Sequence, residues 1–237
     1  MRNEILLVAM LAVVYASVLL WYRLFGETGL LCFTVFATIA ANIEVLLLVD
    51  AFGMEMTLGN ILFSSTFLVT DILSEVAGKK AANRAVGVGI ATSLLFILVS
   101  QSWLLYQPNG NDWAFPSIQS IFSNTPRLMV ASLAVYAVVQ VFDVWAYHKW
   151  WAFTTRRFGD ARRFLWLRNN GSTLLSQLLN TFLFTFAAFL GVYPLQTLCS
   201  IVLSSYLIFI VTALADTPAV YLARRIKDRQ DARASML

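Results

Sequence analysis

The sequence predicts an all-α, polytopic membrane protein, folded as a helical bundle of about seven transmembrane helices. Of the 237 residues, 59% are hydrophobic and 13% are charged, whereas a soluble domain carries about 25% charged residues. The hydrophobic residues form long runs, and about 20 mostly apolar residues are enough for a helix to cross the hydrocarbon core. The basic residues lie in short tracts between these runs, a pattern typical of membrane topology rather than of nucleic-acid binding. Together these features exclude a soluble globular domain.

Each apolar run is interpreted as a helix, because lipid offers no partner to an unpaired backbone amide. The first run lacks a small-residue cleavage site and is followed almost at once by another run, so we expect it to remain as a helix. We expect one transmembrane domain over residues 1–237, with an extra N-terminal helix at 1–26, a six-helix core at 28–225 and a cytoplasmic tail at 226–237. The predicted spans are residues 5–24, 29–49, 58–75, 85–106, 128–151, 173–190 and 195–222.

The distribution of basic residues predicts the orientation in the membrane. If the chain crosses the membrane at each of these seven spans, successive loops lie on opposite sides. Only Arg2 and Arg127 then lie on one side. The other 15 of the 17 basic residues share the opposite side: Arg23, Lys79, Lys80, Arg84, Lys149, Arg156, Arg157, Arg162, Arg163, Arg168, Arg224, Arg225, Lys227, Arg229 and Arg233. Because basic loops stay in the cytoplasm, we expect a multi-pass protein of the cell (inner) membrane, with its N-terminus outside and its C-terminus inside.

Polar side chains within the predicted spans are the candidates for function. An ionisable group inside a span costs about 2.5–3.5 kcal/mol on insertion scales, so such a residue is first considered functional. Counting along each helix at about 1.5 Å per residue places one group of them in a single layer, about 8–12 Å from the cytoplasmic surface. That layer contains Asp71, Asp143, Gln177, Asn180 and Asp216.

Structural roles compete with functional ones for the acidic residues. Asp71 and Asp143 could pair with Lys or Arg side chains that reach in from the cytoplasmic face. Glu75 lies four residues before Lys79, which favours a salt bridge at the interface. Asp216 stands in an Ala-Asp-Thr-Pro segment, where the proline could end or kink the helix.

Other polar residues carry weaker signals. Gln177 and Asn180 could join neighbouring helices by hydrogen bonds of about 0.6 kcal/mol each. Asn42 and Glu44 lie nearer the external half, where Glu44 could line an access path or help to form a proton site. His148 is the single histidine and lacks an HExxH context, and no P-loop or GxSxG motif occurs. We therefore expect no metal, no cofactor and no catalytic residue.

Three segments, in order, resemble a known family. Residues 67–80 (FLVTDILSEVAGKK) are similar to the signature of the queuosine precursor transporter family. Residues 140–145 (QVFDVW) and 166–181 (WLRNNGSTLLSQLLNT) resemble its second and third segments. This family is also described as vitamin uptake transporters, and it resembles the substrate-binding membrane subunits of energy-coupling-factor systems. Some members carry an acidic residue where this chain has Asn180, which can hydrogen-bond a purine-like edge but cannot take up a proton.

The resemblance implies uptake of a 7-deazaguanine base, such as 7-cyano-7-deazaguanine or 7-aminomethyl-7-deazaguanine, for the synthesis of queuosine in tRNA. The chemistry of the polar layer is compatible, since a carboxylate can accept hydrogen bonds from N1–H and the 2-amino group together. Amide side chains could donate to the 6-oxo group, and aromatic rings could stack on the base. The predicted substrate site contains Asn42, Glu44, Phe67, Asp71, Gln140, Asp143, Trp145, Tyr147, Gln177 and Asn180.

Alternative functions remain at this stage. The chain could instead be the substrate-capture subunit of an energy-coupling-factor type vitamin transporter, which needs a separate energising module. An intramembrane enzyme is disfavoured because no Ser-Lys, Asp-Asp or metal-ligand motif of known spacing occurs. The expected partners are a small-molecule substrate and the lipid bilayer, not nucleic acid. The small residues Gly87 and Ala91 would also permit close helix contacts in a homodimer.

Overall fold

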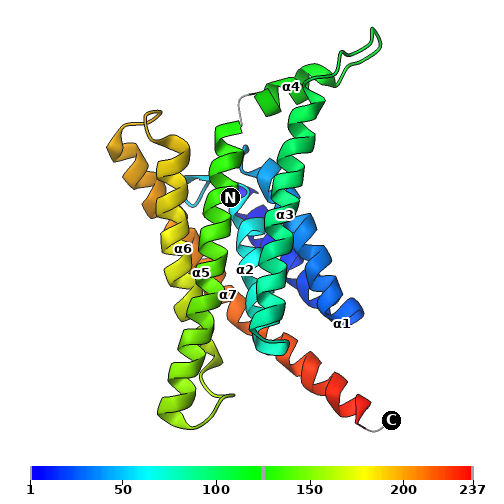
Figure 1. Cartoon of the computed structure of the whole chain (residues 1–237). Helices are drawn as coiled ribbons and strands as arrows, with labels where there is room; N and C mark the ends of the chain where they lie inside the picture. Colours follow the sequence, from blue (N-terminus) through cyan, green and yellow to red (C-terminus); the bar gives the residue numbers. More distant parts are fainter. Residues whose placement is uncertain (1, 124–125, 236–237) are drawn as a thin grey trace.

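The computed structural model describes residues 2–123 and 126–235, and most of them are helical (Figure 1). Within these residues, five helices are long and apolar enough to cross a membrane: α1 (Arg2–Glu44), α3 (Lys79–Trp103), α5 (Pro126–Phe158), α6 (Leu165–Phe189) and α7 (Leu195–Ala234). The remaining elements are β1 (Leu48–Ala51), β2 (Met54–Thr57), α2 (Asn60–Val76) and α4 (Phe115–Ser123). The predicted all-α, polytopic helical bundle is thus confirmed.

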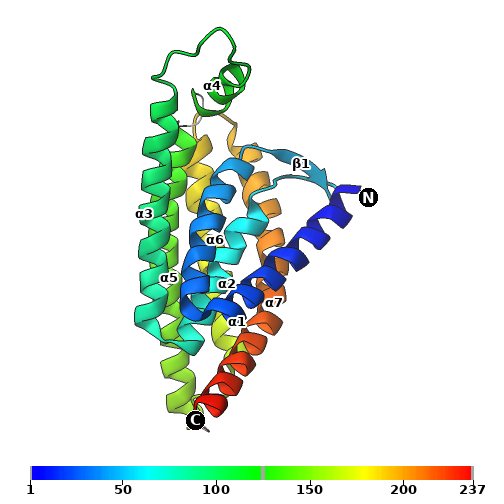
Figure 2. The same ribbon diagram turned by 90° about the vertical axis from the view of Figure 1, so that its right-hand side faces the viewer.

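The bundle has two distinct ends. The short hairpin of β1 and β2 lies near one end, beyond which α4 projects, and we call this the hairpin end (Figure 2). The opposite end carries the loop at 159–164 and the C-terminal part of α7, and we call it the basic end because Arg162, Arg224 and Lys227 lie there. The chain alternates between these ends, so helices that are distant in sequence become neighbours.

Two predicted spans are joined in the single element α1. The helix bends at Gly26, whose φ of 61° and ψ of −142° lie outside the helical region. Glycine adopts a positive φ without the steric cost that a Cβ would add. The first half of α1 runs from the N-terminus toward the basic end, and the second half returns to β1 (Figure 2).

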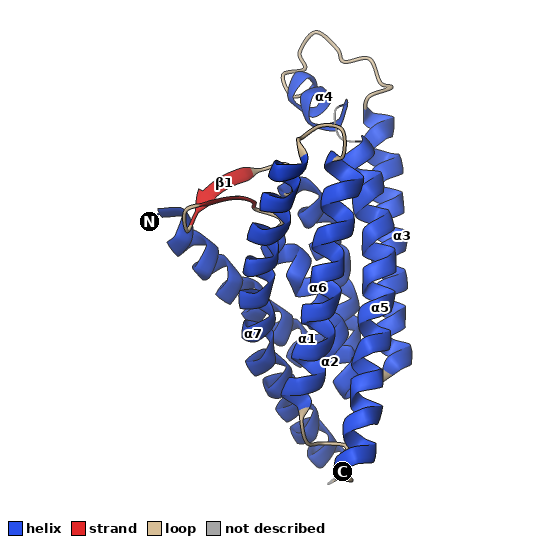
Figure 3. Cartoon of the chain, turned by 90° about the vertical axis from the view of Figure 1, so that its left-hand side faces the viewer, coloured by secondary structure: helices blue, strands red, loops and turns tan. Residues whose placement is uncertain are grey.

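The end of the second predicted span is wrong. The helix ends at Glu44, and residues Leu48–Ala51 form a strand that pairs antiparallel with Met54–Thr57 (Figure 3). Phe52 and Gly53 connect the strands with φ values of 55° and 73°, as a tight hairpin turn requires. Asn3 Nδ2 donates a 2.8 Å hydrogen bond to the backbone oxygen of Asp50, which ties the hairpin to the start of α1.

Helix α2 lies in the interior of the bundle. Of its 17 residues, 14 are buried, and the helix contacts α1, α3, α5 and α7. Its hydroxyl groups are accommodated because Ser64, Ser65 and Thr70 donate to backbone carbonyls of the preceding turn. The polar residues of α2 therefore face other helices rather than lipid.

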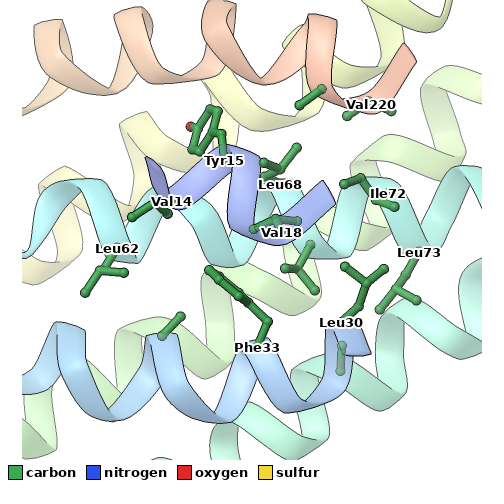
Figure 4. Packing of buried hydrophobic residues seen from close by; sticks show 14 of the residues in the cluster. Val14, Tyr15, Val18, Leu30, Phe33, Leu62, Leu68, Ile72, Leu73 and Val220 are labelled. Carbon is green, nitrogen blue, oxygen red and sulfur yellow. The ribbon is translucent and has the colours of Figure 1, made fainter. Parts of the chain in front are cut away.

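Apolar packing between α1, α2 and α7 forms the main core. Val18 and Leu30 of α1 meet Leu68 and Ile72 of α2, and Val220 of α7 closes the cluster (Figure 4). The outward faces are apolar as well, as Leu95 and Leu98 of α3 illustrate. Apolar surfaces on both sides are expected of a bundle whose outer face contacts lipid.

Two further differences concern the segment between the predicted spans 85–106 and 128–151, and the end of the chain. The loop contains helix α4, whose start is capped by the Asp112 carboxylate, which accepts the backbone N–H groups of Ala114 and Phe115. Helix α7 does not end near Asp216 but continues through Pro218 to Ala234. The helix therefore includes most of the segment expected to be a tail.

Candidate functional site

A cavity lies between the helices in the half of the bundle nearest the hairpin. Its empty volume is about 820 Å³, a figure that includes solvent at its open mouth. Its walls come from α1, β2, α2, α3, α5, α6 and α7, so nearly the whole bundle contributes. The chain thus forms this cavity at the hairpin end of its polar interior.

Three asparagines from three helices line this cavity. They are Asn42 of α1, Asn60 of α2 and Asn180 of α6, and none is more than 9% exposed. The Asn60 Oδ1 accepts a hydrogen bond of 3.1 Å from the Thr57 hydroxyl, whereas its Nδ2 has no partner within the described residues. Each carboxamide can both donate and accept hydrogen bonds. The cavity therefore presents a neutral polar lining with donors and acceptors.

Aromatic side chains form the apolar part of the lining. The Phe63 ring lies 6.2 Å from both the Tyr136 and the Phe209 rings, measured between centroids. Phe184 of α6 adds a further ring to the cavity wall. Phe67, a predicted site residue, does not line the cavity but supports Phe63 from behind at 5.5 Å. Such rings offer flat surfaces on which a planar heterocycle can stack.

Three buried carboxylates lie beyond the cavity, toward the basic end. Asp71, Asp143 and Asp216 are at most 1% exposed, and they interact electrostatically with one another. The Thr173 hydroxyl donates to Asp71 Oδ2 at 2.9 Å, and the Ser176 hydroxyl donates to Asp143 Oδ1. Neither carboxylate oxygen of Asp216 has a hydrogen-bond partner within the described residues. We call these three residues the carboxylate layer.

The distance between cavity and carboxylate layer follows from helical geometry. Three helices each carry a cavity residue five or seven positions before a carboxylate: Thr66 before Asp71, Tyr136 before Asp143, and Phe209 before Asp216. At about 1.5 Å per residue, the layer lies about 8–10 Å below the cavity lining. The carboxylates therefore do not line the cavity in this conformation.

The two glutamines of the predicted site have different environments. Gln140 Nε2 donates to the Thr66 hydroxyl at 2.7 Å, which joins α5 to α2. Gln177 is fully buried, and neither its oxygen nor its nitrogen has a partner within the described residues. It lies on the same face of α6 as Thr173, four residues before it, and near Asn180, three residues after it. Gln177 thus lies between the cavity and the carboxylate layer.

The remaining predicted residues lie outside the cavity lining. The Trp145 side chain is 47% exposed on the outer surface of α5. Tyr147 is fully buried near the basic end, where its hydroxyl donates to Glu75 Oε2 at 2.9 Å. Glu44 is half-buried at the end of α1. Of the ten predicted site residues, only Asn42 and Asn180 line the cavity.

An ion-pair network closes the basic end. Arg168 of α6 is fully buried and binds Glu75 of α2, with a shortest N–O distance of 2.7 Å. Arg224 of α7 approaches the same carboxylate at 3.3 Å. The Arg168 guanidinium also lies over the Trp151 ring, 4.3 Å from its centroid. The predicted pairing of Glu75 with Lys79 is wrong because α2 ends at Val76, so the two residues do not share one helix.

Several cavity residues were not among the ten predicted site residues: Asn60, Phe63, Tyr136, Phe184 and Phe209. One signal could have found part of the set. Asn60, Phe63 and Phe67 follow one another at spacings of three and four, which places them on one face of a helix. Which helix face meets which neighbour is set by tertiary packing, so the sequence alone does not locate the shared cavity.

Comparison with known proteins agrees with the membrane architecture. Residues 57–223 match the family described as "Putative vitamin uptake transporter". A protein of Bacillus subtilis (strain 168) named "Probable queuosine precursor transporter" is 39% identical over 212 residues, which cover 90% of each chain. The "Queuosine precursor transporter" of Escherichia coli (strain K12) is 29% identical over 150 residues, covering 63% of this chain and 62% of its own length. No solved structure matches the chain.

These matches confirm the resemblance that the three sequence segments indicated. They extend over the helices that build the cavity, the carboxylate layer and the ion-pair network. The relatives are named transporters, which confirms the expectation of a transport protein rather than an enzyme. The chain is thus a multi-pass membrane protein that belongs to the putative vitamin uptake transporter family.

Proposed function

We propose that this chain imports a queuosine precursor, 7-cyano-7-deazaguanine or 7-aminomethyl-7-deazaguanine, for the synthesis of queuosine in tRNA. The observation that carries the proposal is the cavity of three asparagines and several aromatic rings, in a chain 39% identical to a protein named as such a transporter. The base binds in the cavity while this is open, and it is released after the helices rearrange at the basic end. This is alternating access within a single chain.

The lining of the cavity suits a deazaguanine. The base presents N1–H and a 2-amino group as donors and a 6-oxo group as an acceptor, all on one edge. Asn42, Asn60 and Asn180 can supply both the acceptors and the donor that this edge needs. Phe63 and Phe184 supply faces for stacking. A neutral lining also suits the uncharged deazaguanine ring that the two precursors share, since no charged side chain among the described lining residues needs to be desolvated there.

The predicted contacts of Asp71 and Asp143 with the base fit a later stage of transport. Both carboxylates lie below the cavity, so a base held by Asn180 does not reach them in this conformation. A base that moved one to two helical turns toward the basic end would meet them. We infer that the cavity is the external site and that the carboxylate layer borders the path beyond it.

The proposed orientation places the hairpin end outside and the basic end in the cytoplasm. It is supported by the positions of basic residues at one end, where Arg162 pairs with Asp228 and Arg224 donates to the Arg162 backbone oxygen. Basic loops and tails stay on the cytoplasmic side. The open cavity therefore faces the external medium, and the ion-pair network closes the cytoplasmic side.

Rescue of queuosine synthesis tests the proposed function. The chain is expressed in cells that cannot make queuosine precursors, the free base is supplied, and tRNA queuosine is measured by mass spectrometry. We expect queuosine in these cells and none in cells with an empty vector. A chain that reaches the membrane without restoring queuosine would contradict autonomous import. Rescue only after addition of a separate ATPase module would support a capture subunit instead.

A glycine substitution tests whether the cavity is the site used. A Cβ at Gly89 of α3 would overlap the Tyr136 hydroxyl and lie 2.9 Å from the ring carbon Cε1. We expect Gly89→Ala to push Tyr136 into the cavity and weaken uptake about fivefold or more, because overpacking costs about 1–3 kcal/mol. Gly87→Ala is the control, since nothing lies within 4 Å of a Cβ there. Equal uptake by both variants, at equal membrane levels, would locate the site elsewhere.

A further inference from the structure

The carboxylate layer lacks the partners that buried charges require. Asp71 and Asp143 each have one oxygen without a hydrogen-bond partner within the described residues, and Asp216 has two. No salt bridge joins any of the three to Lys, Arg or His in the described part of the chain. An isolated carboxylate in an apolar interior is costly, and protonation is the usual way to avoid the cost.

No cationic side chain pairs with Asp216 within the described residues. Tyr15 of α1 lies beside α7 (Figure 4), and its hydroxyl, 3.3 Å from the Thr212 backbone oxygen, also interacts with the Asp216 carboxylate but carries no positive charge to neutralise it. The facing charged residues are Asp71 on α2 and Asp143 on α5, and both carry the same sign as Asp216 when ionised. The layer therefore favours bound protons over three negative charges.

The nearest cations are held elsewhere. Arg168 and Arg224 both bind Glu75, one turn beyond Asp71 on α2. Arg162 binds Asp228 at the surface. These arginines of the basic end are thus paired with Glu75 and Asp228, and within the described residues they form no ion pair with the carboxylate layer.

A second, independent feature indicates that a hydrogen-bonding species can pass between the cavity and the carboxylate layer. Gln177 is fully buried, and both of its amide atoms lack partners within the described residues. One turn below it, Thr173 donates to Asp71, and the adjacent Ser176 donates to Asp143. Asn180, nearly one turn above, lines the cavity. An unpaired amide at this point can hydrogen-bond to a species that passes between the two.

The ligand of the layer is a proton rather than a metal ion. Within the described residues, no three His, Cys, Asp or Glu side chains meet closely enough to hold a metal. The carboxylates come from three different helices, and Asp71 and Asp143 accept hydrogen bonds from different hydroxyl groups, those of Thr173 and Ser176. A carboxylate, in contrast, needs no second ligand to bind a proton.

We propose that Asp71, Asp143 and Asp216 form the proton-binding site that couples import to the proton gradient. A proton from outside adds to a carboxylate of the layer, and the resulting carboxylic acid is neutral. The same proton leaves to the cytoplasm after the Glu75–Arg168 network opens, which regenerates the carboxylate. The proposal rests on the transport function but not on the identity of the base.

Infrared spectroscopy of the purified, full-length protein tests the site without any substrate. We expect the wild type near neutral pH to show the carbonyl stretch of buried, protonated carboxylic acid, and Asp216→Asn to lose intensity there. Asp231→Asn, in the exposed part of the same helix, is the control and should match the wild type. Absence of the band from the wild type would overturn the proposal, and this outcome does not depend on whether any variant folds.

Transport in proteoliposomes tests the coupling. With an inward proton gradient, the wild type should accumulate 7-aminomethyl- or 7-cyano-7-deazaguanine and acidify the lumen, and a protonophore should abolish accumulation. Asp216→Asn, or Asp143→Asn if the former does not fold, should still exchange labelled for unlabelled base but should not accumulate it. Accumulation that is driven by sodium, or that persists in both variants, would overturn proton coupling. A protonated layer in a protein that moves neither base would instead contradict the proposed function.

Discussion

Replacing Arg168 with glutamine is expected to lower the free energy of unfolding by about 3–5 kcal/mol. Arg168 is fully buried, and its guanidinium binds both oxygens of Glu75, with distances of 2.8 and 2.7 Å from Nη2. The variant would leave Glu75 in a site where its own side chain is 4% exposed, with only Arg224 at 3.3 Å as a charged partner. The loss of stability should therefore reflect an uncompensated buried charge more than a lost contact.

A surface pair provides the matched control. Arg162 binds Asp228 at 2.6 Å, but the two side chains are 64% and 52% exposed. Arg162→Gln should therefore cost about 0–1 kcal/mol, as exposed ion pairs usually do. Thermal unfolding in detergent, followed by tryptophan fluorescence, measures both variants, and Trp151 beneath the guanidinium reports on the site directly. Equal destabilisation by the two variants would contradict the importance of burial.

The double variant Glu75→Gln with Arg168→Gln separates charge from packing. Removal of both charges leaves two neutral amides that can hydrogen-bond to each other, so we expect part of the lost stability to return. Replacing a whole buried pair is often nearly neutral, whereas removing one member is not. The loss of unfolding free energy in the double variant is compared with the sum of the losses in the two single variants. If the two were equal, the ion-pair network would stabilise the fold through packing alone and not through charge.

Much of the fold follows from the sequence because the bilayer constrains it strongly. Long apolar runs predict helices that the structure contains, since no other local structure satisfies the backbone in lipid. The polar layer could also be predicted from the sequence, because the helical rise places Asp71, Asp143 and Asp216 at similar depths. The burial and mutual proximity of these residues agree with that reasoning, although their role is a matter for the proposed experiments.

The features that the sequence did not predict depend on where helices end and on which helices pack against each other. The second predicted span includes Leu48 and Val49 because they continue an apolar run, whereas the turn at Phe52 and Gly53 makes them the start of a hairpin. The partner of Glu75 was mispredicted because the helix breaks before Lys79. The cavity combines side chains from six helices and one strand, so its lining depends on packing that no single segment specifies.

Asn180 is, with Asn42, one of the two predicted site residues that line the cavity, and its substitution should have a large effect on binding. We expect Asn180→Leu to weaken binding of a deazaguanine about 5–150-fold, because a hydrogen-bonding group of the base left unpaired in a dry site costs about 1–3 kcal/mol. Asn111→Leu, in the exposed loop before α4, is the matched control and should bind as the wild type does. Binding is measured by calorimetry with the purified protein.

The more discriminating substitution at this position is Asn180→Asp. A carboxylate there would attract the cationic 7-aminomethyl base but offer no comparable gain to the neutral 7-cyano base, while losing the amide donor to the 6-oxo group. The ratio of the two affinities should therefore shift toward the aminomethyl base, whatever the absolute affinities become. An unchanged ratio, together with normal binding by Asn180→Leu, would mean that the base is held away from α6. The carboxylates of Asp71 and Asp143 would then be the leading candidates for direct contact, as the sequence first suggested.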